Sequence, residues 1–130
     1  MPRVFITGLG FITSIGNDAA TVSRNLGELR HGLELYPPFQ TPDTPCKIVG
    51  TIKGFKTDST DPEDWTFPSH YKIKRELLRS MAPNGLFAHC AALQAIADAR
   101  LTEADLSNAD TGLYAASGGS PYLTHYHHER

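Results

Sequence analysis

The chain has 130 residues, of which 40% are apolar, and its 12 basic and 14 acidic side chains leave a formal charge of -2. This length suits one domain of ordinary size, and the near-balanced charge argues against a dedicated nucleic-acid-binding protein, which would carry a basic excess. No apolar run approaches the ~18 residues of a membrane span, the opening lacks a secretory signal, and two cysteines without metal-ligand spacing predict a reduced, cytoplasmic protein.

The first expected elements are a strand and a helix. The strand runs from Arg3 to Thr7, a short β-branched stretch that ends at a glycine. Asn17 can cap the helix, and Asp18 suits its positive first turn. Apolar residues then recur at helical spacing until three residues form a C-terminal stop: Arg30, His31 and Gly32.

The middle of the chain predicts little regular structure. Residues 36–46 are rich in proline and must be irregular. Cys46–Ile52 is expected to be a second strand, or one arm of a hairpin. The polar stretch Lys56–Pro68 indicates a loop, and the basic stretch His70–Arg79 has helical character.

The last third of the chain predicts a long helix and a strand. Pro83 suits the first turn of a helix that reaches Ala99, with Ser80 as its cap. Thr102 and Asp105 can cap a short helical turn. A third strand is expected over Thr111–Ala116. Strands that alternate with helices indicate an α/β layered fold.

The long helix is apolar on almost every side. Beyond its first turn only His89, Gln94 and Asp98 are strongly polar. At about 100° per residue, Gln94 lies about 140° from His89 and Asp98 about 180° from it, so these residues do not share one face. Such a helix suits the interior of a larger protein. The alternative is an ordinary core helix, one side of which is weakly covered by small alanines.

The glycines near the start raise the question of phosphate binding. Gly8 and Gly10 match the first two positions of the Gly-x-Gly-x-x-Gly dinucleotide fingerprint, but Thr13 occupies the third and Gly16 comes three residues late. A second strand that ends in an acidic residue is also missing, and no Gly-Lys-Ser/Thr follows as in a P-loop. We therefore interpret the glycines as serving tight turns and a close backbone crossing. A dinucleotide-binding domain remains an alternative.

Five stretches in order are similar to one known family. The opening "RVFITGLGFITSIGND" resembles the start of β-ketoacyl-acyl-carrier-protein synthases, the condensing enzymes of the thiolase-like superfamily. The stretch "LGELRHGLE" resembles the end of that family's first helix, and "CKIVGTIKGF" resembles the strand that follows. The stretch "ALQAIADARL" is similar to the helix before the family's third strand, and "DTGLYAASGGS" resembles that strand with its turn. The resemblance implies the N-terminal part of a thiolase-like α/β fold, with an incomplete sheet and one inner apolar helix.

Two positions depart from the family pattern. The family usually has a glycine after its long helix, before the leucine, and here Arg100 stands there. An arginine in a left-handed cap carries a steric penalty that glycine avoids. The stretch "MAPNG" also lacks the acidic residue that commonly follows its methionine. Both departures concern the subfamily more than the family.

The resemblance implies a decarboxylating Claisen condensation of acyl and malonyl thioesters, in fatty acid or polyketide biosynthesis. In the family, a cysteine nucleophile and two histidines lie downstream of the third strand. Residues 1–130 therefore resemble the N-terminal segment of a synthase domain, truncated before the nucleophile. We expect no catalytic residue in this acyltransferase segment, no cofactor, and no activity of the chain alone. When complete, the synthase is expected to form a homodimer.

Neither cysteine of the chain fits the role of the nucleophile. Cys90 is expected in the middle of the apolar helix, where a thiol is inert, and Cys46 precedes a strand. His89 is next to Cys90, but neighbouring helical side chains point about 100° apart and cannot pair. Both thiols are therefore interpreted as structural.

A basic stripe is the first candidate binding feature. Lys72, Arg75 and Arg79 have i, i+3 and i+7 spacing, which places them on one stripe of a helix. In the family, a basic segment just before the long helix takes part in docking the acidic acyl carrier protein, which such a stripe would steer. The alternative is an ordinary solvated face.

A glycine-serine turn is the second candidate. The resemblance places Gly118, Gly119 and Ser120 beside the acyl channel, and Gly119 would leave that channel open. A plain strand-ending turn is the alternative. The histidines His125, His127 and His128 are interpreted as part of a family loop, and no metal site is expected because carboxylate or cysteine partners are missing.

Three functions remain open. The first is the N-terminal segment of a β-ketoacyl synthase, with the acyl carrier protein and the missing C-terminal part as partners. The second is a non-enzymatic carrier-binding or scaffold module. The third, less favoured, is the dinucleotide-binding domain. Neither nucleic acid nor a membrane is expected as a partner.

Overall fold

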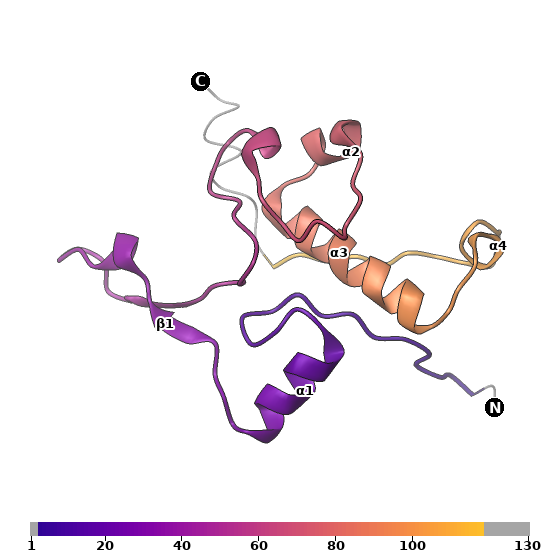
Figure 1. Cartoon of the computed structure of the whole chain (residues 1–130), viewed down its shortest axis with the longest axis horizontal. Helices are drawn as coiled ribbons and strands as arrows, with labels where there is room; N and C mark the ends of the chain where they lie inside the picture. Colours follow the sequence, from indigo (N-terminus) through magenta and orange to yellow (C-terminus); the bar gives the residue numbers. More distant parts are fainter. Residues whose placement is uncertain (1–2, 119–130) are drawn as a thin grey trace. The chain divides into compact units, whose positions relative to one another are not determined.

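The computed structural model describes residues 3–118 (Figure 1). They fall into two compact units, one formed by residues 3–10 and 54–118 and the other by residues 11–53. The described helices are α1 (Ala19–Gly27), α2 (Arg75–Arg79), α3 (Pro83–Asp98) and α4 (Glu103–Leu106). Strands β1 (Leu33–Leu35) and β2 (Ile48–Gly50) form a two-stranded sheet, and two 3-10 turns are η1 (Pro37–Phe39) and η2 (Pro62–Asp64). The described part is thus a small mixed α/β structure.

Helix α1 begins one residue later than the sequence indicates. Asp18, not Asn17, is its N-cap, and the Asp18 carboxylate accepts a hydrogen bond from the Thr21 backbone N–H at 2.8 Å. This hydrogen bond lowers the pKa of Asp18. The Asn17 side chain instead donates to the Lys53 carbonyl at 2.5 Å.

The end of α1 also differs from the expectation. The residue with left-handed backbone is Leu29, with a φ of 55°, and the next backbone N–H, that of Arg30, donates to the Asn25 carbonyl at 2.8 Å. The predicted stop at Gly32 is therefore wrong. Gly32 has a packing role, because a Cβ there would lie 2.5 Å from the Ser14 carbonyl oxygen.

The sheet of residues 11–53 is a short hairpin. β1 and β2 pair antiparallel, with Leu33 opposite Gly50 and Leu35 opposite Ile48. The expectation that Cys46–Ile52 supplies one hairpin arm is confirmed, whereas β1 was not predicted. Between the arms the proline-rich stretch is irregular apart from η1.

Helix α3 has the expected length and start. Pro83 is in its first turn and the helix ends at Asp98, but its N-cap is Ala82 rather than Ser80. Ser80 instead is the C-cap of α2, where its hydroxyl donates to the Leu77 carbonyl at 2.7 Å. Since α3 begins at Pro83, its N-cap is the residue directly before that proline, two positions after Ser80.

The segment that contains Gly8 and Gly10 crosses α3 so closely that its backbone contacts the backbone of the helix. A Cβ on Gly10 would lie 2.9 Å from the backbone nitrogen of Ala95, and one on Gly8 would lie 2.6 Å from that of Ala99. Between them, the Leu9 N–H donates to the Asp98 carboxylate at 2.9 Å. The expected close backbone crossing is confirmed. Asp98, which binds the crossing segment, is one of the few polar residues of α3.

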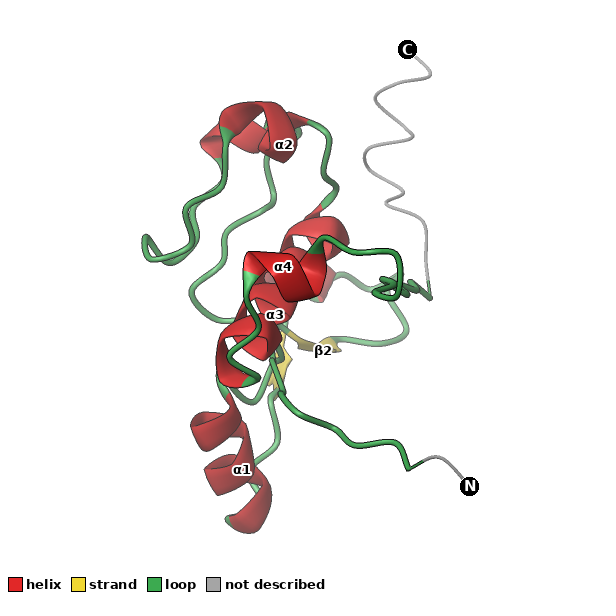
Figure 2. Ribbon diagram, turned by 90° about the vertical axis from the view of Figure 1, so that its right-hand side faces the viewer, coloured by secondary structure: helices red, strands yellow, loops and turns green. Residues whose placement is uncertain are grey.

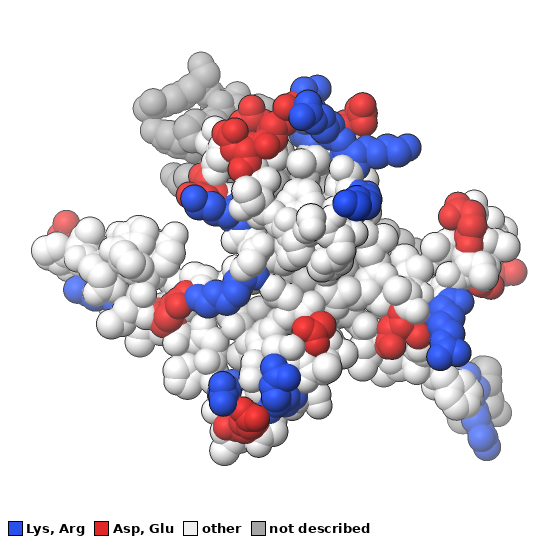
Figure 3. All heavy atoms as spheres, in the orientation of Figure 1, with Lys and Arg blue, Asp and Glu red and all other residues white. Residues whose placement is uncertain are grey.

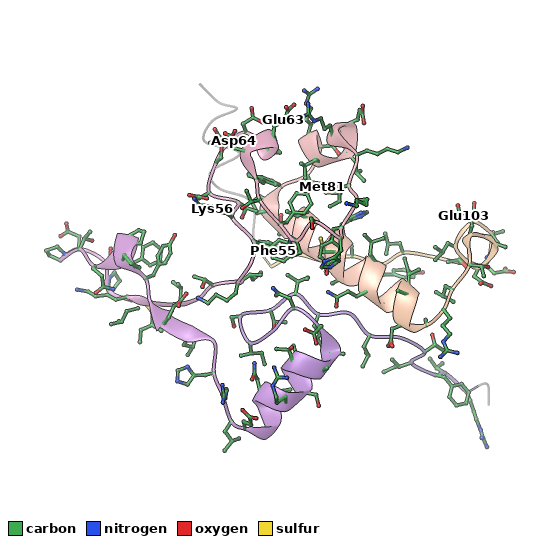
Figure 4. All side chains as sticks on the ribbon, in the orientation of Figure 1. Phe55, Lys56, Glu63, Asp64, Met81 and Glu103 are labelled. Carbon is green, nitrogen blue, oxygen red and sulfur yellow. The ribbon has the colours of Figure 1, made fainter. Side chains whose placement is uncertain are left out.

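An aromatic group packs on another side of α3. The Phe55 ring lies edge-on against the Phe87 ring at 5.4 Å between centroids and 6.3 Å from Tyr71 (Figure 4). The Tyr71 hydroxyl accepts a hydrogen bond from the Gln94 amide at 2.6 Å. Gln94 and Asp98 therefore each fix a different segment to the same helix.

The described residues cover α3 only in part. Leu86 and Cys90 are fully buried, and they are its only buried residues within the described part. Leu93 and Ala97 follow them by seven residues on the same stripe and are exposed, Leu93 by 36%. Enclosure of this helix on all sides by further polypeptide thus stays a prediction.

Two predicted strands are absent among the described residues. Arg3–Thr7 and Thr111–Ala116 are drawn as loop in Figure 2 and form no ladder. Their large side chains stand in solvent, with Val4 at 95% and Tyr114 at 97% exposure. A strand is stabilised by hydrogen bonds to a neighbour and by one covered face, and here both segments lack these.

The last helix shows the predicted cap. The Asp105 carboxylate accepts hydrogen bonds from the backbone N–H and the hydroxyl of Thr102, at 2.7 and 2.6 Å. These bonds lower the pKa of Asp105. The capping box predicted at the start of α4 is therefore confirmed.

Arg100 occupies a left-handed position directly after α3. Its φ is 56°, and the following Leu101 N–H donates to the Ile96 carbonyl at 3.1 Å, which closes the helix end. The steric penalty expected for a side chain at this site is thus present in the structure.

We expect Arg100→Gly to stabilise the chain by about 0.5–1 kcal/mol, because the relieved left-handed strain exceeds the added backbone entropy of the unfolded chain. Urea unfolding monitored by circular dichroism measures this change. Arg100→Ala is the matched control, since it removes the charge and keeps the Cβ. Equal stabilisation by both variants would assign the effect to charge instead of backbone conformation.

Candidate functional site

The predicted basic stripe does not lie on one helix. The helix expected over His70–Arg79 begins only at Arg75, and Lys74 is its N-cap with extended backbone. Lys72 therefore lies before the helix, beside Tyr71, whose buried side chain is held by α3. This attachment explains why the segment before α2 follows an irregular path despite its helical spacing.

The two arginines of α2 share one carboxylate. Arg79 Nε donates to Glu63 Oε1 at 2.7 Å, and Arg79 Nη2 also contacts this oxygen. Arg75 Nη1 lies 3.7 Å from Glu63 Oε2. Figure 4 shows Glu63 on η2, next to α2. Because the Arg79 side chain is still 64% exposed, a partner from outside has access to the guanidinium.

The turn that carries Glu63 is held by several local bonds. The Asp61 carboxylate caps η2 by accepting from the Glu63 N–H at 2.9 Å. Asp64 accepts from the Ser59 hydroxyl at 2.8 Å, and the buried Trp65 donates its indole N–H to the Ser59 carbonyl at 2.8 Å. Glu63 is thus presented to α2 by a well-anchored turn.

The two lysines of the segment differ from the arginines. Lys72 and Lys74 are exposed, and neither takes part in an ion pair among the described residues. Figure 3 shows acidic and basic side chains next to one another at the top of the view, over η2 and α2. The basic segment is therefore a mixed-charge surface.

Neither cysteine has the surroundings of a nucleophile. Cys90 is fully buried in α3, and burial raises the pKa of its thiol to about 11, so the thiolate is scarcely formed at neutral pH. Cys46 is exposed and its thiol donates to the Ile48 carbonyl at 3.4 Å. His89 precedes Cys90 on the helix, and the two side chains point in directions about 100° apart.

The proposed channel turn is described only in part. The Ser117 hydroxyl accepts a hydrogen bond from the Asn84 amide at 2.8 Å, which links the turn to the start of α3. A Cβ at Gly118 would meet no atom within 4 Å. Gly119 and Ser120 lie outside the described residues, as do three histidines: His125, His127 and His128.

The unit of residues 11–53 contains a hollow that the sequence did not indicate. Its volume is about 430 Å³. It is lined mainly by the loop before α1, by Asn25 of α1 itself, and by three polar residues after the helix: Arg30, His31 and Lys53. Arg30 pairs with Glu28 at 2.7 Å and Lys53 pairs with Glu34.

Residues 3–118 contain neither a cluster of metal-ligating side chains nor a helix that could span a membrane. No group of three or more histidine, cysteine, aspartate or glutamate side chains is placed to hold a metal ion there. In the same residues, no helix combines the length and the apolar character needed to cross a membrane.

A family model described as "Beta-ketoacyl synthase, N-terminal domain" matches residues 1–130. The chain belongs to this family. The family expected from the five sequence stretches is therefore confirmed over the whole chain. In this β-ketoacyl synthase domain the glycines of the opening stretch serve the crossing of α3, as described above.

Several curated relatives agree with this assignment. The chain is 35% identical over 118 residues to the 3-oxoacyl-(acyl-carrier-protein) synthase 1 of Haemophilus influenzae, covering 91% of this chain and 26% of that protein. It is 34% identical over 120 residues to the synthase 1 of Escherichia coli K12, covering 92% and 26%. The synthase 2 of Synechocystis is 34% identical over 116 residues, covering 89% and 25%.

The chain spans about a quarter of the length of these curated relatives. No solved structure gives a significant match. The membership of the β-ketoacyl synthase family is therefore shown by similarity of sequence.

Proposed function

We propose that the chain is the N-terminal portion of a β-ketoacyl-acyl-carrier-protein synthase and contributes to the decarboxylating condensation of acyl and malonyl thioesters in fatty acid or polyketide biosynthesis. The observation that carries this proposal is the family match over residues 1–130, together with relatives named 3-oxoacyl-(acyl-carrier-protein) synthase. The complete synthase is a cytoplasmic homodimer with a thiolase-like layered fold under this proposal.

The chain's own part in this chemistry is structural. Its buried thiol, Cys90, is protonated at neutral pH and cannot attack a thioester. Helix α3 holds Ser117 through Asn84 and the opening segment through the hydrogen bond from Leu9 to Asp98, so it sets the position of both segments. Supplying the polypeptide that the relatives have beyond this region, and assaying malonyl decarboxylation against the chain alone, tests the proposal.

This assay also separates the second candidate, a non-enzymatic carrier-binding or scaffold module. That candidate is favoured by the absence of a nucleophile-like thiol among the described residues, and it predicts no gain of activity in the mixture. The dinucleotide-binding alternative loses its basis, because α3 occupies the space that a phosphate would need beside Gly8 and Gly10.

Docking of an acidic acyl carrier protein is proposed for Lys72, Arg75 and Arg79. Their exposure supports this role, although they share no helical stripe. We expect reversal of all three charges to glutamate to weaken carrier binding at low salt about tenfold or more, with a smaller effect at high salt.

Isothermal titration of the full chain with purified acyl carrier protein measures this loss. The matched control reverses three exposed cations elsewhere in the chain, giving the same change of net charge: Arg3, Arg24 and Lys47. Unchanged affinity in the first variant, or an equal loss in the control, would contradict docking at this segment.

A further inference from the structure

We propose that Glu63 is an internal competitor that occupies Arg75 and Arg79 and that an acidic carrier must displace. This inference rests on the proposed carrier docking and goes beyond it, because it assigns a function to an acidic residue that opposes binding. It predicts that the affinity of the docking surface is limited by the chain's own carboxylate.

The contacts of Glu63 are those a docked carboxylate would make. One of its oxygens, Oε1, accepts from two nitrogens of Arg79, and the other lies 3.7 Å from Arg75 Nη1. Hydrogen bonds between a guanidinium and a carboxylate are charge-assisted and stronger than those between neutral groups. An incoming aspartate or glutamate must therefore break these contacts before it can form its own.

The surrounding charges lead to the same conclusion. Residues 56–79 carry five cationic and five anionic side chains, so this segment has no net charge. A neutral segment steers an acidic partner weakly. Removing the carboxylate that touches the arginines therefore restores a local positive charge where the partner would bind.

Displacement also affects the salt dependence of binding. While Glu63 is present, each carrier–arginine pair forms at the expense of an existing pair, so the net number of ion pairs changes little. Without it, carrier binding adds new ion pairs, which salt screens. The affinity should thus become both higher and more sensitive to salt.

Glu63→Gln tests the proposal, because it keeps the size of the side chain and removes its charge. We expect it to tighten binding of purified acyl carrier protein by about three- to tenfold at low salt. Asp64→Asn is the matched control. Asp64 is in the same turn and gives the same change of net charge, but its carboxylate accepts from Ser59 and is not among the ion pairs of the described residues.

A double variant checks that the effect passes through the arginine. In an Arg79→Gln background, Glu63→Gln should have at most about half of its effect, since only the longer Arg75 contact remains. The fluorescence of buried Trp65 verifies in each variant that the turn is intact. Glu63→Asp, which keeps the charge and shortens the side chain, should give an intermediate gain, and it replaces the glutamine variant if that variant does not fold.

The outcomes separate this inference from the docking proposal. Equal effects of Glu63→Gln and Asp64→Asn would overturn the competitor role, because general electrostatics would then suffice. If Glu63→Gln binds the carrier equally well or more weakly while Arg79→Glu still weakens binding, the competitor role is overturned and the docking proposal stands. No effect of reversing all three charges, at Lys72, Arg75 and Arg79, would remove the docking proposal itself.

Discussion

Gly10→Ala is expected to destabilise the chain by about 2–3 kcal/mol, a large part of the stability of an ordinary domain. The added Cβ would lie 2.9 Å from the backbone nitrogen of Ala95 and against the carbonyl group of Ala91. Backbone atoms of a helix cannot move aside as the end of a flexible side chain can. The segment must therefore leave α3, and the hydrogen bond from Leu9 to Asp98 is lost with it.

Urea unfolding of the full chain, followed by circular dichroism, measures this loss. Gly27→Ala is the matched control, because Gly27 is in α1 and a Cβ there would meet no atom within 4 Å. We expect that control to be neutral or to stabilise by up to about 1 kcal/mol, since alanine favours helix over glycine. Equal stability of the Gly10→Ala variant and the parent chain would refute the close crossing.

Reconstitution is expected to give the largest change in activity. The chain alone should show no condensation of acyl and malonyl thioesters above background, because its buried thiol, Cys90, is a poor nucleophile and cannot accept the acyl group. Co-expressed with the part of the Haemophilus influenzae relative that follows the matched region, it should support measurable turnover. That outcome requires the chain to supply the scaffold that the added part lacks.

Three controls make this experiment decisive. The added part alone must be inactive, and the relative's own N-terminal region must restore activity to it. The Gly10→Ala chain should restore much less than the parent chain, because its opening segment no longer lies on α3. Turnover by the chain alone, or failure of the chain where the relative's region succeeds, would contradict the proposed function.

The sequence predicted the features that depend on neighbouring residues. Pro83 in the first turn of α3 and the Thr102–Asp105 capping box are set within a few residues. The start of α1 was one residue off, since Asn17 and Asp18 are both good caps and only the contact with Lys53 decides between them.

Elements that depend on distant partners were predicted less well. The strands expected at Arg3–Thr7 and Thr111–Ala116 have β-branched residues, but strand formation needs a neighbouring strand that local sequence does not reveal. The helical spacing around Lys72 was overridden by the bond between Tyr71 and Gln94, which lie 23 residues apart.

Only the basic residues of the candidate site were predicted from the sequence. Charge spacing identified Arg75 and Arg79, but not the carboxylate that binds them. Glu63 lies 16 residues before Arg79, beyond any helical periodicity. The Lys56–Pro68 loop is acidic and the His70–Arg79 segment is basic to the same extent. This opposite charge was the signal in the sequence for the pairing.

The bond between Leu9 and Asp98 has a consequence for the nascent chain. Its two residues are 89 positions apart, which at about 5–20 residues per second corresponds to about 4–18 seconds of translation. The opening segment must remain without its helical partner throughout that interval, so the crossing of Gly8 and Gly10 over α3 can form only late in synthesis. Slower elongation before α3 should therefore delay the formation of this crossing.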